Sequence, residues 1–200
     1  PPTADLARAL IDRCTALVRG RKVVLVGGVL AGSTLRVRRL RGWGASDLLV
    51  LAQGIGTGEL PGPDEAQVAV IESGKALSLT EEVRSWIQFA TDPPAAARHA
   101  LEDFDPDRTA LCLLSAFAQV DRYGGRESLG GRTPAIAALE DKSLNDDLWD
   151  TAGVPRAPAR VVPADRQRIL DAAGDLDRGD GTVWSADASD GMNGGGDSVR

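Results

Sequence analysis

The chain has 200 residues and a mass of 20.9 kDa, which is room for one large domain or two small ones. Its hydrophobic share of 42% is enough apolar material for a sizeable core and excludes global disorder. A net charge of −6 and an aromatic share of 4% argue against a nucleic-acid partner, because such proteins carry basic patches or stacking aromatics.

The chain shows no targeting signal. No stretch approaches the roughly 20 apolar residues of a membrane span, and the first residues lack a secretory pattern. Cys14 and Cys112 lie in apolar contexts, which favours buried, reduced thiols over a disulfide or a zinc site. We therefore expect a cytoplasmic protein with no membrane partner. Because the chain starts at Pro1 and its only methionine is Met192, we also expect a segment of a longer protein.

The first part of the chain alternates helix and strand. Short apolar runs rich in valine and leucine predict strands that are buried on both faces, as in a parallel sheet. The expected strands are residues 23–26, 47–52, 67–71 and 109–114, with a glycine- and proline-rich loop over 53–63. The expected helices are residues 3–19 and 33–41, one that follows a capping box at 78–81, and one that runs from Asp92-Pro93 to about 102. This alternation predicts a three-layer α/β sheet.

The character of the sequence changes after about residue 119. A loop rich in glycine and arginine, residues 123–133, marks the expected domain boundary. Beyond it the pattern predicts a helix over 141–152, ended by Gly153 and Pro155, and a second helix over 164–173, closed by Gly174. Short strands are expected over 160–162 and 182–184, and a glycine-dense loop over 187–197.

Two features of the first part invite a functional interpretation. Gly27 and Gly28 follow the first strand, where a ligand can approach the backbone, although the full dinucleotide fingerprint is absent. We expect either a tight turn or a weak substrate contact at these glycines. Four arginines, at positions 36, 38, 39 and 41, predict a solvated helix face, with an anion contact or a subunit interface as alternatives. The single histidine, His99, is expected on a helix surface.

The second part combines a lysine with a glycine loop. Lys142 follows Asp141 at the expected start of a helix, and a lysine there is a point charge suited to phosphate. About 40 residues later, a strand leads into Asp190-Gly191-Met192-Asn193-Gly194-Gly195-Gly196. A flexible glycine loop exposes backbone N–H groups that can fold over phosphates. The order and spacing of the two elements are more specific than either alone.

In this order the motifs resemble the ATP-grasp superfamily, in particular its peptide-forming carboxylate–amine ligases. The resemblance covers residues 138–200 by motif, and residues 1–118 by architecture alone. It implies an α/β fold: a Rossmann-like preATP-grasp domain with a parallel sheet over 1–130, then an incomplete α+β ATP-grasp subdomain, truncated, over 131–200. The implied ATP-binding residues are Lys142, Ser185, Gly191, Asn193, Gly194, Gly195 and Gly196.

The resemblance further implies the chemistry. ATP would convert a carboxylate to an acylphosphate, which an amine then attacks to form an amide. Small-molecule carboxylate and amine substrates are the implied partners, ATP and Mg²⁺ the implied cofactors, and the metal ligands are expected beyond Arg200. No catalytic residue is assigned, and a homodimer is left open. We expect the 200 residues alone to be inactive.

One departure keeps a second hypothesis open. Many family members place another lysine at the end of the strand before the glycine loop, but here residues 183–186 read Val-Trp-Ser-Ala. The alternative is a non-catalytic, preATP-grasp-like module that binds a ligand or another protein. A dinucleotide enzyme of Rossmann type ranks last because its fingerprint is missing.

Overall fold

The structure is a computed structural model. It describes residues 4–72, 74, 78–118, 120–132, 136, 139, 141–185 and 198–199. The chain divides into two compact units, Pro1–Thr133 and Pro134–Arg200.

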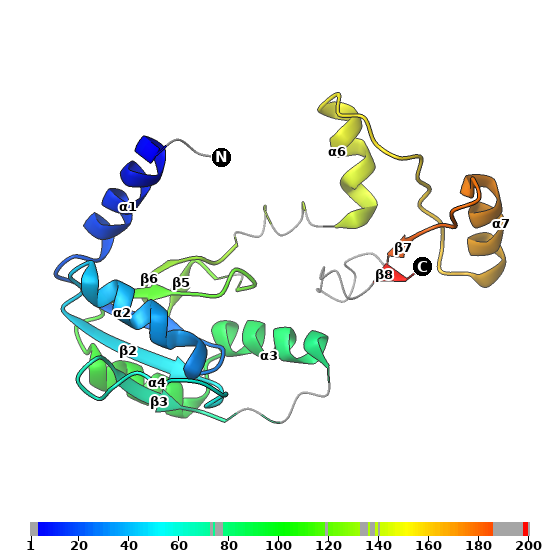
Figure 1. The fold of residues 1–200 in the computed structure, drawn as a ribbon. Coiled ribbons are helices and arrows are strands. Elements are labelled where there is room, and N and C mark those ends of the chain that lie inside the picture. Colours follow the sequence, from blue (N-terminus) through cyan, green and yellow to red (C-terminus); the bar gives the residue numbers. More distant parts are fainter. Residues whose placement is uncertain are drawn as a thin grey trace. The chain divides into compact units, whose positions relative to one another are not determined.

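The first unit contains a mixed sheet whose strands are mostly parallel. Within its described residues the strands are β1 (Lys22–Val26), β2 (Asp47–Ala52), β3 (Gln67–Val70), β4 (Leu111–Leu113), β5 (Arg122–Tyr123) and β6 (Arg126–Leu129). Their order across the sheet is β3-β2-β1-β4-β6-β5, and only the β5–β6 pair is antiparallel (Figure 1). Strands β1 and β2 lie side by side within the sheet, each between two parallel neighbours, which explains why both are apolar on both faces. The α/β class expected from the sequence is confirmed.

Helices cover the sheet on both faces. The helical elements of this unit are α1 (Ala4–Val18), the 3₁₀ turn η1 (Ala31–Ser33), α2 (Thr34–Gly42), α3 (Leu79–Thr91) and α4 (Ala95–Phe104). On one face of the sheet, Val37 of α2 packs in a core with Val23 and Val50. On the other face, Leu101 of α4 packs in a core with Val24. The two cores establish the three layers that the alternation predicts.

Two helix starts test the capping signals in the sequence. Ser78 caps α3 as predicted, since its hydroxyl accepts a hydrogen bond from the Glu81 backbone N–H at 3.2 Å. The expected cap at Asp92-Pro93 is wrong, because α4 begins at Ala95 with Pro94 as its N-cap residue. A second proline can occupy the position before the first helical turn, and here it displaces the start by two residues.

The prediction of a loop over residues 123–133 is also wrong for the first half of this range. Strands β5 and β6 form a hairpin there, and β6 continues the sheet in parallel with β4. The hairpin turns at Gly124 and Gly125, both with positive φ, which is the backbone that a two-residue hairpin turn requires. Arg126 begins β6 and is fully buried, so the strand has no apolar pattern to reveal it.

The second unit is less regular. Its described elements are the 3₁₀ turn η2 (Lys142–Leu144), α6 (Asn145–Thr151), α7 (Arg166–Leu176), β7 (Trp184–Ser185) and β8 (Ser198–Val199). The helix expected over 141–152 is confirmed as η2 and α6, and it ends as predicted before Gly153. There the N–H of Val154 donates to the Trp149 carbonyl at 3.0 Å, and that of Gly153 to the Asp150 carbonyl at 3.1 Å. These two bonds form a Schellman motif.

Three expectations for this unit need correction. Residues 160–162 form no strand, because nothing pairs with them and the Val161 side chain is 69% exposed. Helix α7 starts at Arg166, after the N-cap Asp165, and runs past Gly174, which therefore does not close it. The strand expected over 182–184 is shifted to Trp184–Ser185, where it pairs antiparallel with Ser198–Val199.

Candidate functional site

The candidate site of the first unit lies where β1 and β2 end. Gly27 and Gly28 follow β1 with φ of 84° and 76°, so the chain turns sharply there. The Gly27 N–H donates to the Leu51 carbonyl, and the Gln53 N–H donates to the Gly28 carbonyl, each at 2.8 Å. These bonds fix the glycine turn against the end of β2. The carboxyl ends of parallel strands are where α/β proteins bind small molecules.

A pocket opens beside this turn. Its volume is about 240 Å³, and it lies between the ends of β1 and β2 and the first two turns of α3. The lining residues are Gly28, Val29, Gln53, Gly74, Glu82, Ser85 and Trp86. Gly28 is thus at the pocket, as the sequence suggests, whereas Gly27 supports the turn behind it.

Gln53 lines the pocket with a buried polar side chain whose orientation is fixed by hydrogen bonds. It is 91% buried, with only 9% of its surface exposed. Its Nε2 donates to the Ser85 hydroxyl at 2.8 Å and to the Ser85 carbonyl at 3.2 Å, which fixes the orientation of the amide. Its Oε1 finds no hydrogen-bond partner within the described part of the chain. A buried carbonyl oxygen without a donor is costly unless a ligand or water satisfies it.

The rest of the lining is acceptor-rich and aromatic. Glu82 is the one charged residue among the lining residues that the structure describes, and it is half-buried. Trp86 is also half-buried and meets Phe117 at a ring-centroid distance of 6.4 Å. The described lining residues therefore supply one carboxylate, one unsatisfied carbonyl oxygen and an aromatic wall, and none of them is a cation.

The arginine cluster on α2 has a structural role that the sequence interpretation missed. Arg38 pairs with Glu59 at 2.5 Å and with Glu65 at 2.7 Å, while Arg41 donates to the Glu65 carbonyl at 2.8 Å. Hydrogen bonds to both carboxylates raise the pKa of Arg38, and the same bonds lower the pKa of both glutamates. The solvated-face prediction holds for Arg36, Arg38 and Arg39, which are exposed, although Arg38 also ion-pairs with the loop between β2 and β3. It fails for Arg41, which is half-buried and bonds to the same loop.

The lysine of the second unit lies at a capped turn. Lys142 opens η2, directly after Asp141. The Asp141 carboxylate accepts from the Ser143 backbone N–H at 2.9 Å and from the Ser143 hydroxyl at 2.7 Å. The acidic residue of the Asp-Lys pair is therefore used as a cap, and it fixes the backbone position from which Lys142 extends.

The remaining predicted ATP contacts are only partly described. Ser185 is exposed in β7, next to Trp184. Gly191, Asn193 and Gly194–Gly196 lie outside the described residues. The strands on either side of that segment, β7 and β8, pair antiparallel. Lys142 and Ser185 belong to the second unit, and Gly27 and Gly28 to the first.

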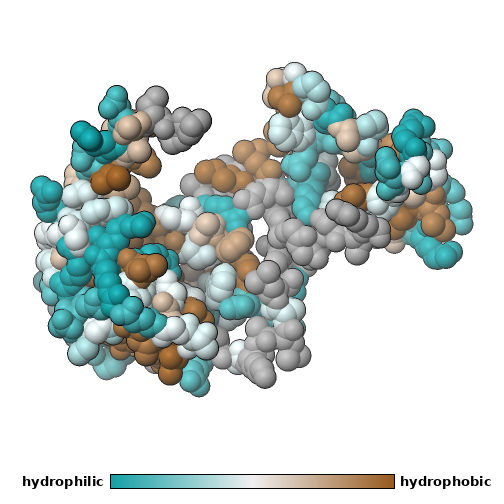
Figure 2. Space-filling model, in the orientation of Figure 1, coloured by the Kyte–Doolittle hydropathy of each residue, from teal (hydrophilic) through white to brown (hydrophobic). Residues whose placement is uncertain are grey.

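Three residues singled out in the sequence, one histidine and two cysteines, match their expected surroundings only in part. His99 is exposed on α4, with Nε2 at 3.4 Å from the Asp103 carboxylate. Cys112 is buried in β4, but Cys14 on α1 is only half-buried, and both thiols are free. Leu6, Leu10 and Ile11 of α1 are each more than half exposed, and part of this apolar surface is brown in Figure 2.

Sequence reasoning missed Gln53, Glu82, Ser85 and Trp86. One signal was available, since Gln53 is the first polar residue after the apolar run of β2, at the end of a parallel strand where ligands bind. Among the described residues, no group of three or more histidine, cysteine or acidic side chains could hold a metal ion, and no helix has the length and apolar character needed to cross a bilayer.

Comparisons of the chain with protein-family models, with curated proteins and with solved structures found no match.

Proposed function

We propose that this chain is part of an ATP-dependent carboxylate–amine ligase of ATP-grasp type, in which the second unit contacts the phosphates of ATP. One observation carries the proposal. The capped Asp141–Lys142 turn leads into a helix that ends at Gly153, and β7 and β8 then pair across the glycine-rich segment. This is the order of elements that the motif resemblance implies.

The first element suits a phosphate contact. The Asp141 carboxylate accepts two hydrogen bonds from Ser143, so it stabilises the backbone of the turn. Lys142 extends from the start of the same turn, and an ammonium group there offers a compact charge for a phosphate oxygen. The residues present therefore fit the phosphates of ATP, which would supply the phosphoryl group that activates a carboxylate.

The second element suits a closing loop. Residues 186–197 join two antiparallel strands, so both ends of the segment are held at one place. Glycine-rich backbone between such strands can present N–H groups to phosphates and exclude water from a reactive intermediate. Ser185, the last residue of β7, would add a hydroxyl at the entry to this loop.

The first unit supports the proposal at the level of topology. Its parallel strand order β3-β2-β1-β4, with helices on both faces, is compatible with the Rossmann-like preATP-grasp domain that we propose. The pocket beside Gly28 would then serve a small-molecule substrate.

The test is binding of Mg-ATP to the 200-residue chain, followed by NMR of the backbone amides. We expect shifts at Gly191 and Gly194–Gly196 that Lys142→Ala abolishes. Arg178→Ala is the matched control, since it removes one exposed positive charge from the same unit and should leave the shifts in place. Glycine amides that do not respond, or that respond equally in both variants, would overturn the proposal. Turnover of ATP by these 200 residues alone would contradict the expectation that they are inactive.

A second candidate function is a non-catalytic ligand-binding module. The fixed Gln53 amide with its unsatisfied oxygen favours it, as does the absence of lysine from residues 183–186. Such a module would bind its ligand at the first-unit pocket equally well with and without Mg-ATP. In a longer protein that carries this chain, Lys142→Ala would lower ATP turnover by a ligase and leave a binding module unaffected.

A further inference from the structure

We infer that the pocket at the ends of β1 and β2 binds a small molecule through a primary ammonium group. The inference goes beyond the proposed function, because it rests on contacts within the first unit alone. It concerns the chemical class of the ligand, which neither the glycine turn nor the nucleotide motifs specify.

The Gln53 side-chain oxygen lacks a hydrogen-bond donor among the described residues. Gln53 donates through its Nε2 to both the hydroxyl and the carbonyl of Ser85, so turning the amide over would set its oxygen against the Ser85 carbonyl oxygen and lose that bond. Its Oε1 is buried and unpartnered within the described residues. A ligand that satisfies this oxygen must therefore bring a hydrogen-bond donor.

The described lining of the pocket carries a negative charge. Among the described lining residues Glu82 contributes the only formal charge, and no ion pair of its carboxylate is present in the described part of the chain. A half-buried carboxylate repels phosphate and carboxylate groups and attracts a cation. An ammonium group meets both demands, because it carries three N–H donors and a positive charge.

The pocket is small and is lined on one side by a tryptophan. Trp86 offers an aromatic wall, and a cation near an aromatic face gains further attraction. A Cβ built on Gly28 would meet no atom within 4 Å, so the glycine leaves its side of the pocket open. The volume of about 240 Å³ is below the range of about 300–1,000 Å³ for drug-sized ligands, which indicates a small amine.

The experiment follows the indole N–H of Trp86 by NMR in the full chain, with Trp86→Phe identifying the signal. The probe is alaninamide, which has a primary ammonium group and no carboxylate. Tetramethylammonium tests charge without a donor, glucose tests donors without charge, and inorganic phosphate tests an anion. We expect saturable shifts with alaninamide only.

Two variants connect the signal to the pocket. Glu82→Gln should weaken alaninamide binding roughly tenfold or more, and Gln53→Met should do the same by removing the acceptor. Glu81→Gln is the matched control, because it removes an exposed carboxylate from the same turn of α3 and should leave the affinity unchanged. Glu82→Gln changes a half-buried helix residue without loss of volume, so it remains informative if Gln53→Met fails to fold.

Three results would overturn the inference. They are an indole signal that alaninamide does not move, equal affinity in Glu82→Gln and Glu81→Gln, and stronger binding of phosphate or glucose than of alaninamide. No nucleotide is added in this experiment, so the alaninamide result and the Mg-ATP result with Lys142→Ala are independent. Either proposal can fail while the other stands.

Discussion

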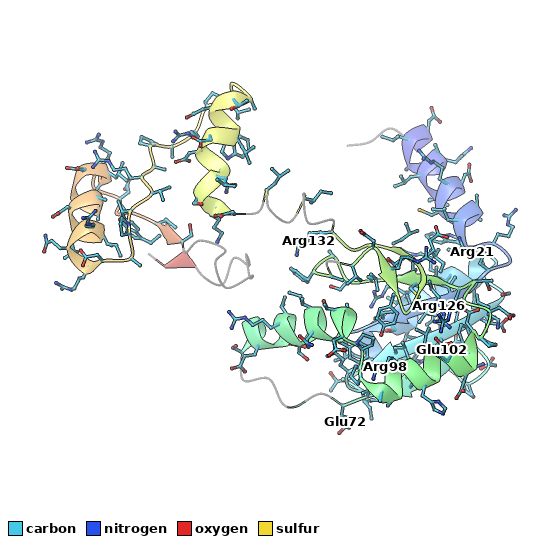
Figure 3. The ribbon with its side chains drawn as sticks, turned by 180° about the vertical axis from the view of Figure 1, so that it is seen from behind. Arg21, Glu72, Arg98, Glu102, Arg126 and Arg132 are labelled. Atoms are coloured by element: carbon cyan, nitrogen blue, oxygen red, sulfur yellow. The ribbon has the colours of Figure 1, made fainter. Side chains whose placement is uncertain are left out.

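Arg126 Nε lies 2.8 Å from Asp105 Oδ2, and both side chains are almost completely buried. Arg126 begins β6, whereas Asp105 directly follows α4, so the pair joins the edge hairpin to the helix layer (Figure 3 labels Arg126 and its second partner, Glu102). Arg126 also lies 3.1 Å from Glu102 Oε1. Asp105 in turn accepts from the backbone N–H groups of Thr109 and Ala110, which lead into β4. The pair therefore organises the junction of α4, β4 and β6.

We expect Asp105→Ala to be strongly destabilising. It leaves the Arg126 guanidinium buried without its nearest counter-charge, and breaking such a pair costs about 3–5 kcal/mol. Urea unfolding would measure the loss of free energy. Asp92→Ala is the control, since Asp92 forms an exposed pair with Arg98 at 3.7 Å and its removal should change stability little. Equal stability of the two variants would show that Asp105 has no organising role.

The same carboxylate predicts a dependence on pH. Burial raises the pKa of Asp105, but hydrogen bonds from Ala110, Arg126 and Thr109 outweigh it and hold the pKa below its ordinary value of 3.8. A carboxyl with a lowered folded-state pKa stabilises the protein fully above the unfolded pKa. This contribution is lost as pH falls through the folded pKa. We expect the unfolding free energy of the wild type to fall more steeply below pH about 4 than that of Asp105→Asn. Parallel curves in urea unfolding at graded pH would contradict this prediction.

The central sheet could be predicted because its information is local. β1 and β2 are buried on both faces, so their sequences are continuous apolar runs that periodicity recognises. β6 could not be predicted, because its first residue is an arginine whose burial depends on Asp105 and Glu102, 21 and 24 residues away. Conversely, Val161 and Val162 look like a strand, yet they find no neighbouring strand and remain irregular.

The candidate site also has one part that the sequence predicts and another part that it does not. Gly28 is visible in the sequence because a glycine turn after an apolar strand is a local signal. The Gln53–Ser85 contact links residues 32 positions apart, and only the packing of α3 beside the end of β2 brings them together. The unsatisfied Gln53 oxygen that specifies the ligand therefore exists only in the folded chain.

The two cysteines should differ in reactivity. Burial raises the pKa of the Cys112 thiol to about 12, so hardly any thiolate forms at neutral pH, and the residue is enclosed in β4. Cys14 is half-buried on α1 and accessible to a small reagent. In a disulfide-exchange assay we expect one thiol to react with the folded protein and the second only after unfolding. Cys14→Ser should abolish the reaction with the folded protein, and Cys112→Ser should preserve it. The reverse pattern would show that the Cys112 thiol is accessible in the folded protein.

Gly130 offers a test of the junction between β6 and the segment after β4. Its φ is 95°, and a Cβ built on it would lie 2.5 Å from the Leu114 carbonyl oxygen, a backbone atom fixed by the hydrogen bond from the Leu114 N–H to the Leu129 carbonyl. Gly20 is the matched control, since its φ is 70° but a Cβ there would meet no atom within 4 Å. Both alanine variants incur the left-handed strain of about 1–2 kcal/mol, and only Gly130→Ala adds a backbone clash. Gly130→Ala should therefore lose more unfolding free energy than Gly20→Ala by a clear margin in urea titrations. Equal losses would mean that the chain after β4 does not approach Gly130 as closely as this, because the strain common to both positions would then account for the whole effect.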